Sequence, residues 1–164
     1  MDAGDIMPFI ASAKTVFQTM LATDITPGRP SACPLVPSFA NDVSGIIGLS
    51  GDVVGMVVLS FPGSTAEKVV ETFAGAAMPI DSPDFSDAVG ELVNMISGAA
   101  KAKLEGRTVS ISCPSVVVGH GHKVQQPSDS LCMYIPFDSP MGRFGIEVAL
   151  KESAAQSKPA SEAA

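Results

Sequence analysis

The spacing of apolar residues predicts a long amphipathic helix over residues 84–105. Five of them recur at steps of three and four, which places them on one face of an α-helix of about six turns. These residues are Phe85, Val89, Leu92, Ile96 and Ala99. The Asp84 carboxylate can cap the first turn, and Gly106 suits the left-handed conformation in which many helices end. We therefore predict a capped helix that buries one face.

The same reading predicts helices and strands over most of the chain. In order, we predict a helix over 5–21, an edge strand around 32–39, a hairpin over 43–49 and 53–61, a helix over 65–74, the helix over 84–105, strands over 108–112 and 115–118, and a hairpin over 131–137 and 143–150. This order divides into two similar halves. It predicts an α+β fold in which long helices pack on an antiparallel sheet. We predict one domain over 1–151 and a disordered tail over 152–164.

Composition excludes several classes of function. The net charge is −7, which argues against nucleic acid as a partner because such proteins cluster Lys and Arg. Residues 43–61 are nearly free of charge, but Ser50, Gly51 and Asp52 interrupt them with turn residues. Two strands fit that stretch better than a membrane-spanning helix. The N-terminus lacks the positive region of a signal peptide, so we expect a cytoplasmic protein without membrane insertion.

Cysteine and histidine positions give no clear metal site. Cys33, Cys113 and Cys132 are widely spaced and form no Cys-x-x-Cys motif, so we expect reduced, mostly buried thiols rather than a disulfide or a zinc site. His120 and His122 lie between glycines and have no third ligand close by in the sequence. We interpret them as part of a mobile surface loop, and we expect no metal ligands in this chain.

A polar row follows a second face of the helix over 84–105. It comprises Asp87, Glu91, Asn94, Gly98 and Lys101 at steps of three and four. Asn94 is unusual there, because asparagine is a poor helix former and its side chain prefers caps. Gly98 lowers helix propensity but leaves room for another molecule to approach. From spacing alone, a solvated helix face is the better interpretation of the row, because most such rows only keep a helix soluble.

The motif Asp87-x-x-x-Glu91-x-x-Asn94, followed later by Pro114, resembles the signature of the CheC/CheX/FliY chemotaxis phosphatases. The run from Glu91 to Lys101 is most similar to the CheX branch, and the similarity extends over all but the C-terminal tail. The resemblance implies a CheC-like duplicated fold. It also implies that this chain hydrolyses the aspartyl phosphate of a CheY-type response regulator in chemotaxis or a related two-component pathway.

The resemblance implies roles for individual residues. Asn94 would orient the attacking water, Glu91 would anchor the regulator, and the Mg²⁺ ion would belong to the regulator, so that this chain has no cofactor of its own. We expect docking along Asp87, Gly98 and Lys101, with Pro114 as a structural part of the motif. In the first helix Ser12, Val16 and Thr19 stand at the matching positions, so only one active face is expected.

The sequence also leads to a prediction of the oligomeric state and to two alternative functions. The β-rich stretches 53–61 and 143–150 are expected to leave a sheet edge, and the resemblance implies a homodimer that covers it. A non-catalytic module that binds a receiver domain or a motor component is the alternative to an enzyme. A small-molecule hydrolase has no nucleophile–base pair to support it. Neither the regulator nor the output of the pathway can be named from the sequence.

Overall fold

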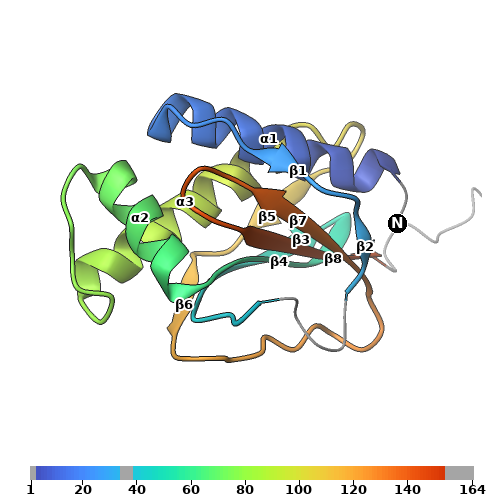
Figure 1. Cartoon of the computed structure of the whole chain (residues 1–164). Coiled ribbons are helices and arrows are strands. Elements are labelled where there is room, and N and C mark those ends of the chain that lie inside the picture. Colours follow the sequence, from blue (N-terminus) through green and yellow to red (C-terminus); the bar gives the residue numbers. More distant parts are fainter. Residues whose placement is uncertain (1–2, 34–38, 154–164) are drawn as a thin grey trace, which may run out of the picture.

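The structure, a computed structural model, describes residues 3–33 and 39–153 and forms an α+β fold (Figure 1). The elements are α1 (Ala3–Leu21), β1 (Thr26–Pro27), β2 (Ser31–Ala32), β3 (Val43–Gly51), β4 (Val53–Phe61), α2 (Gly63–Ala74), α3 (Pro83–Lys101), β5 (Val109–Ile111), β6 (Ser115–Val118), β7 (Leu131–Asp138) and β8 (Phe144–Glu152). The predicted helices and both hairpins are confirmed. Of the predicted edge strand over 32–39, positions 34–38 lie outside the described residues, as does most of the tail predicted over 152–164.

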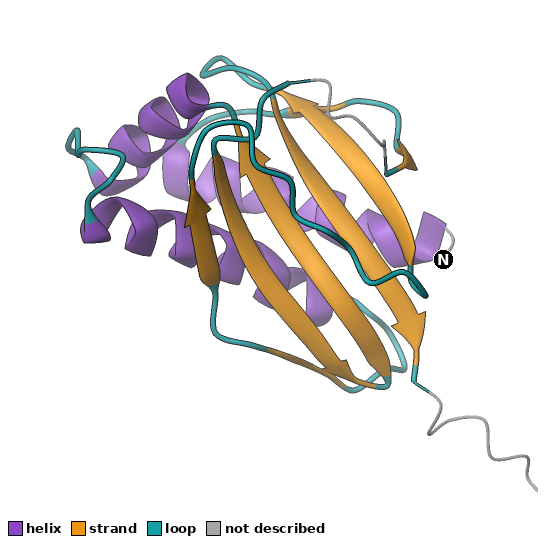
Figure 2. Ribbon diagram, turned by 90° about the horizontal axis from the view of Figure 1, so that it is seen from below, coloured by secondary structure: helices purple, strands orange, loops and turns teal. Residues whose placement is uncertain are grey.

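One antiparallel sheet carries the three helices on a single face (Figure 2). Its strand order is β1-β7-β8-β4-β3-β5, with β2 also paired to β7 and β6 to β3. The hairpins β3–β4 and β7–β8 meet through β4 and β8, so each half of the chain contributes one hairpin. The expectation that 53–61 and 143–150 form an edge is therefore wrong, because β4 and β8 are both paired on both sides.

The helix α3 packs its predicted apolar face against the sheet. Phe85, Val89, Leu92 and Ile96 are at most 1% exposed. Gly45 of β3 allows this close packing, because a Cβ there would lie 2.9 Å from Val93 Cγ1. The predicted ends of the helix need correction. Ser82, not Asp84, is the N-cap, since its side chain accepts the Phe85 N–H at 3.2 Å.

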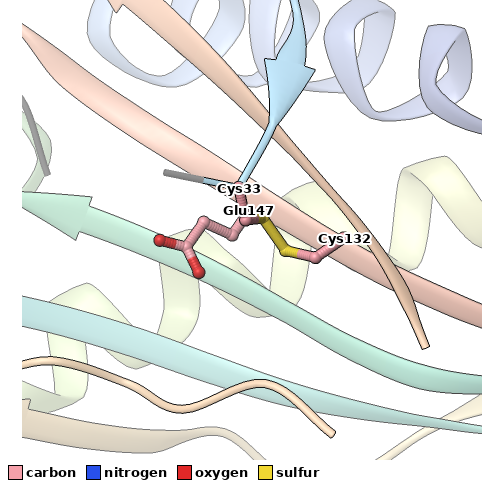
Figure 3. A group of neighbouring side chains, drawn as sticks. All are labelled: Cys33, Cys132 and Glu147. Atoms are coloured by element: carbon pink, nitrogen blue, oxygen red, sulfur yellow. A yellow bond between two sulfur atoms is a disulfide. The ribbon is translucent and has the colours of Figure 1, made fainter. Parts of the chain in front are cut away.

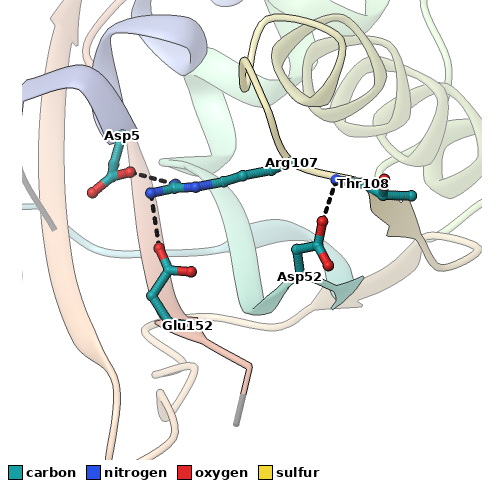
Figure 4. Close-up of polar contacts among 5 residues, drawn as sticks. All are labelled: Asp5, Asp52, Arg107, Thr108 and Glu152. Carbon is teal, nitrogen blue, oxygen red and sulfur yellow. Dashed lines mark hydrogen bonds and ion pairs between the residues drawn. The ribbon is translucent and has the colours of Figure 1, made fainter. Parts of the chain in front are cut away.

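The C-terminal end of α3 comes earlier than predicted. The helix stops at Lys101, and turns connect it to Gly106, which has the expected left-handed conformation with φ of 71°. Arg107 then links this region to other elements (Figure 4). Its guanidinium pairs with Asp5 of α1 at 2.6 Å and with Glu152 of β8 at 2.8 Å. These ion pairs tie the exit of α3 to the first helix and the last strand.

The cysteines differ from the sequence prediction. Cys33 and Cys132 form a disulfide, with their Cα atoms 5.4 Å apart, and Cys113 is free and exposed. The expectation of three reduced, mostly buried thiols is therefore wrong in this structure. The two bonded cysteines are 99 residues apart in sequence, and pairing of β2 with β7 brings them opposite each other. Spacing along the chain carries no sign of that pairing.

Asp42 connects helix α2 to the loop that contains His120. Its carboxylate accepts the Gly63 N–H at 2.8 Å and the Gly121 N–H at 3.1 Å, and it lies 2.8 Å from His120 Nδ1. Burial acts to raise the pKa of Asp42, but the two backbone hydrogen bonds and the His120 ring outweigh it, so this pKa is lowered. His122 Nε2 lies 2.8 Å from Ser44 Oγ. The loop is thus hydrogen-bonded to the sheet.

Within the described ranges, no helix combines the length and the apolar character needed to cross a membrane. Residues 43–61 form the strands β3 and β4, as predicted.

We predict that Asp42→Asn lowers the free energy of unfolding by about 1–2 kcal/mol at pH 7, because its carboxylate accepts the Gly63 N–H at the start of α2 and so acts as a cap. A lowered pKa in the folded state contributes stability above the unfolded value of about 3.9. That contribution is lost as the pH falls through the lower, folded value. Urea unfolding at a series of pH values measures it, with Asp24→Asn, a change at an exposed carboxylate, as the control. A difference from wild type that stays constant down to low pH would contradict this role.

Candidate functional site

The structure places the whole polar row on one side of α3. Asp87 and Glu91 are exposed, whereas Asn94, Gly98 and Lys101 are half-buried. The buried positions between them, including Val93 and Ile96, fix the helix on the sheet. The row is therefore a rigid surface whose side chains are held by a helix rather than by a loop. Rigid placement of this kind favours groups that must be positioned accurately.

Asn94 presents an amide that the fold itself does not use. It lies in the middle of α3, away from both ends, where backbone groups bond within the helix. Among the described residues, no partner hydrogen-bonds to its side chain. An amide can both donate and accept, so it can hold a water molecule in a defined orientation. Its position, half-buried beside the exposed Glu91, leaves it accessible to a docked molecule.

A pocket of about 440 Å³ opens beside the first half of the row. It is lined by Ser86, Asp87, Gly90, Glu91, Pro114 and Val116. The structure thus brings Pro114, which follows β5, against α3 one helical turn before Asn94. Gly90 makes that approach possible, because a Cβ there would lie 3.3 Å from Pro114 Cγ.

Ser86 and Gly90 are site residues that the sequence analysis missed. Both precede Asn94 at helical spacing, and a glycine one turn before the amide was the available signal. The role of this glycine depends on the position of β6 beside α3, and the periodicity of the sequence does not predict that position.

Gly98 is not required by packing inside the domain. A Cβ at this position would contact only the Ile111 Cδ1 atom, at 3.8 Å, which is an ordinary van der Waals distance. Close packing against the described part of the domain's own sheet therefore does not account for this glycine. Gly98 remains a predicted docking position, as do Asp87 and Lys101.

The matching positions of α1 form no second row. Ser12 and Val16 are buried, at 0% and 4% exposed, and the Thr19 hydroxyl donates to the Thr15 carbonyl at 2.8 Å. Lys103, which follows α3, donates to Ser12 at 3.3 Å, so this part of α1 faces the neighbouring helix. At the three matching positions α1 therefore has neither the carboxylate nor the amide that α3 carries.

Comparison with known proteins gives a consistent result. The family model "Chemotaxis phosphatase CheX" matches residues 43–138. A curated Thermotoga maritima protein, "CheY-P phosphatase CheX", is 30% identical over 128 residues, which is 76% of this chain and 82% of that protein. A crystal structure of CheX from Desulfovibrio desulfuricans is 33% identical, with a TM-score of 0.79, over 90% of this chain and 99% of that chain.

A more distant structure shows the same fold. The CheX–CheY–BeF3–Mg complex from Borrelia burgdorferi contains a chain that is 22% identical, with a TM-score of 0.71, over 90% of this chain and 97% of that chain. At this identity the likeness concerns the fold alone. The family model and the Thermotoga relative go further, because the model spans more than half of the chain and the relative is 30% identical over 76% of it. This chain therefore belongs to the CheX family of chemotaxis phosphatases.

Proposed function

We infer that this protein hydrolyses the aspartyl phosphate of a phosphorylated CheY-type response regulator. The observation that carries the inference is the pair Glu91 and Asn94, presented on the exposed side of α3 in a chain of this family. The Thermotoga relative is named as a phosphatase of phosphorylated CheY. A CheX from Borrelia with the same fold forms a complex with CheY. Chemotaxis or a related two-component pathway is the proposed setting, in the cytoplasm.

Hydrolysis of an aspartyl phosphate demands accurate placement of water. The water oxygen attacks phosphorus in line with the bond to the aspartate oxygen, and that bond breaks to leave a carboxylate and inorganic phosphate. Positioning and electrostatics supply most of the acceleration in such reactions. We assign the orientation of the water to the Asn94 amide, which can accept from the water or donate to it. The Mg²⁺ ion that neutralises phosphoryl charge is proposed to sit on the regulator.

Docking is proposed to follow the row from Asp87 to Lys101. Glu91 is exposed one turn before Asn94, so its carboxylate can pair with a cationic group of the regulator while Asn94 reaches the phosphoryl site. The open space over Gly98 allows the backbone of the regulator to come close. The pocket beside Pro114 lies at the opposite end of the contact and offers a recess for a side chain of the regulator.

We also propose a homodimer that pairs through the β6 edge of the sheet. In the described part of the chain, β6 is hydrogen-bonded to β3 alone, and its Val117 and Val118 side chains are 38% and 39% exposed. An exposed apolar edge strand tends to pair with another chain, and β6 has no lysine or proline to prevent it. This edge replaces the one expected at 53–61 and 143–150.

A binding module without catalysis is the alternative function. It would use the same row for docking, but it would have no need for an amide next to the phosphoryl group. The two functions differ in a single measurement, the rate at which phosphate leaves the regulator when this protein is added. Among the described residues nothing hydrogen-bonds to the Asn94 side chain, and an amide left available in this way favours the enzyme.

We predict that Asn94→Ala lowers the rate of regulator dephosphorylation by about 100- to 1000-fold, because losing one group that stabilises the transition state costs about 2.7–4 kcal/mol. Folding should be preserved, since alanine is the better helix former. Loss of radiolabelled phosphate from a phosphorylated regulator, with and without the variant, measures the effect. Gln18→Ala, which removes an exposed helical amide from α1, is the matched control. Full activity of Asn94→Ala would exclude the catalytic role.

We predict that Glu91→Gln weakens binding of the phosphorylated regulator by about tenfold. A charge pair desolvated on docking contributes about 1.5 kcal/mol or more, which is about tenfold in Kd. The Kd of the variant should also depend less on salt, because one screened attraction is gone. Titration calorimetry with a regulator held in its phosphorylated form, at two salt concentrations, measures both. Glu67→Gln, at an exposed position of α2, is the control. An unchanged Kd would remove Glu91 from the docking contact.

We predict that the protein is a dimer at micromolar concentration and that Val117→Lys makes it monomeric, because a lysine on an edge strand opposes pairing. Size-exclusion chromatography with light scattering gives the mass of each. Val54→Lys, at an exposed position of β4, introduces the same charge away from β6 and should remain dimeric. A wild-type protein that elutes with the mass of one chain would refute the dimer.

A further inference from the structure

Three ligand-type side chains meet on the sheet, away from α3. Cys33, Cys132 and Glu147 come from the segment after β2, from β7 and from β8 (Figure 3). Their sulfur and carboxylate oxygen atoms all lie within 4.8 Å of one another, and all three residues are half-buried. They face away from the helices. The strand pairing puts Gly45, which packs on α3, in register with Leu59 and Ile146, so Glu147, the next residue, points to the opposite face.

The surroundings of the Glu147 carboxylate favour a cation as an additional partner. The partner of its carboxylate in the described structure is an amide, the Gln126 Nε2 group at 2.9 Å. The other end of that amide, Gln126 Oε1, is buried and has no hydrogen-bond partner. A carboxylate, an amide oxygen and two sulfur atoms are all electron-pair donors. A carboxylate and an amide oxygen are costly to bury without a donor or a positive charge, and reduction of the disulfide to two thiolates would add negative charge at the same place.

The geometry fits a small thiophilic metal ion. Zinc binds thiolate sulfur at about 2.3 Å and carboxylate oxygen at about 2.0–2.2 Å, so two of its ligands cannot lie much more than about 4.6 Å apart. In the disulfide form the three ligand atoms lie within 4.8 Å of one another, so small side-chain rotations bring them within that limit. The Cα atoms of Cys33 and Cys132 are 5.4 Å apart, and once the disulfide is reduced each sulfur can rotate about its Cα–Cβ bond. Thiolates select Zn²⁺ over Mg²⁺ or Ca²⁺.

We propose that Cys33, Cys132 and Glu147 form a redox-gated site for a thiophilic divalent cation such as Zn²⁺. A dithiol reduces the disulfide by giving two electrons and two protons and itself becomes a disulfide. A phosphine gives two electrons, while water gives the two protons and the oxygen of the phosphine oxide. Either reaction leaves two thiols. The cation then displaces the two thiol protons and takes two thiolates and the Glu147 carboxylate as ligands. Gln126 holds the carboxylate in place, and water completes the tetrahedron.

Metal binding and the disulfide exclude each other, because a disulfide sulfur is no longer a thiolate. Oxidation would release the cation and leave Cys33 joined to Cys132. In a reducing compartment the dithiol form prevails, and there the metal would take over the link between the segment after β2 and strand β7. The proposal does not depend on the phosphatase activity, because the cluster and the α3 row lie on opposite sides of the sheet.

Metal titration of the full chain tests the proposal. The protein is reduced with a phosphine, freed of reductant under anaerobic conditions and titrated with Co²⁺, whose bonds to thiolate give a strong near-ultraviolet absorption. We expect saturation at one equivalent, displacement by Zn²⁺, and release of two protons per ion. The oxidised protein should give no such band. Cys132→Ser should abolish it, and Glu147→Gln should weaken binding by about 10- to 100-fold, the loss typical when a supporting group of a metal site is removed.

Cys113→Ser is the matched control, because it removes a free, exposed cysteine outside the cluster. It should bind Co²⁺ and Zn²⁺ like the wild type. Circular dichroism of each reduced variant checks that it is folded, and Cys33→Ser replaces Cys132→Ser if the latter is not. The proposal is overturned if the reduced wild type shows no thiolate–cobalt band or if the band persists without Cys132 or Cys33. Equal affinity in Glu147→Gln would remove the carboxylate from the site.

Discussion

The pairing of β4 with β8 is the contact on which the rest of the structure depends. Eight residue pairs in register, from Val53 with Glu152 to Ser60 with Gly145, join the hairpins of the two halves into one sheet. Neither hairpin could bury its helix-facing side chains alone. The joined sheet gives α1 and α3 a common surface, and stacking of Phe144 of β8 on Phe17 of α1 and Phe137 of β7 packs α1 on that surface.

Two glycines then decide how α3 presents its functional side. Gly45 lets the helix sit close to β3, which buries the Val93 side, and Gly90 lets Pro114 come against the helix next to Glu91. The row with Asn94 is left open as a consequence. An amide without a partner inside the protein costs little stability on an accessible surface, because water can hydrogen-bond to it. The same amide in the core would need a hydrogen bond from the protein. The proposed catalytic side chain therefore lies at a position where the stability of the fold depends little on which residue is present.

The chain between β6 and β7 crosses the opposite face of the sheet (Figure 2). Asp42 and His122 hold the start of that segment through hydrogen bonds to the backbone and to Ser44, and Gln126 contacts Glu147 further along. This face carries the disulfide and the proposed metal ligands. The helix-covered face supports the α3 row, and the other face carries the proposed metal ligands. The two sets of residues are separate because alternating side chains along each strand point to opposite sides.

The sequence by itself determined the helices, the two hairpins and the Glu91–Asn94 row, because helical and strand periodicities are local and need no knowledge of distant residues. Tertiary structure decided what joins residues far apart in the chain. Cys33 meets Cys132, and Pro114 packs on Gly90, only because β2 pairs with β7 and β6 with β3. Strand order also placed β4 and β8 inside the sheet. Register between distant strands depends on which whole set of apolar faces can be buried together, and that is a property of the assembled sheet rather than of any one segment.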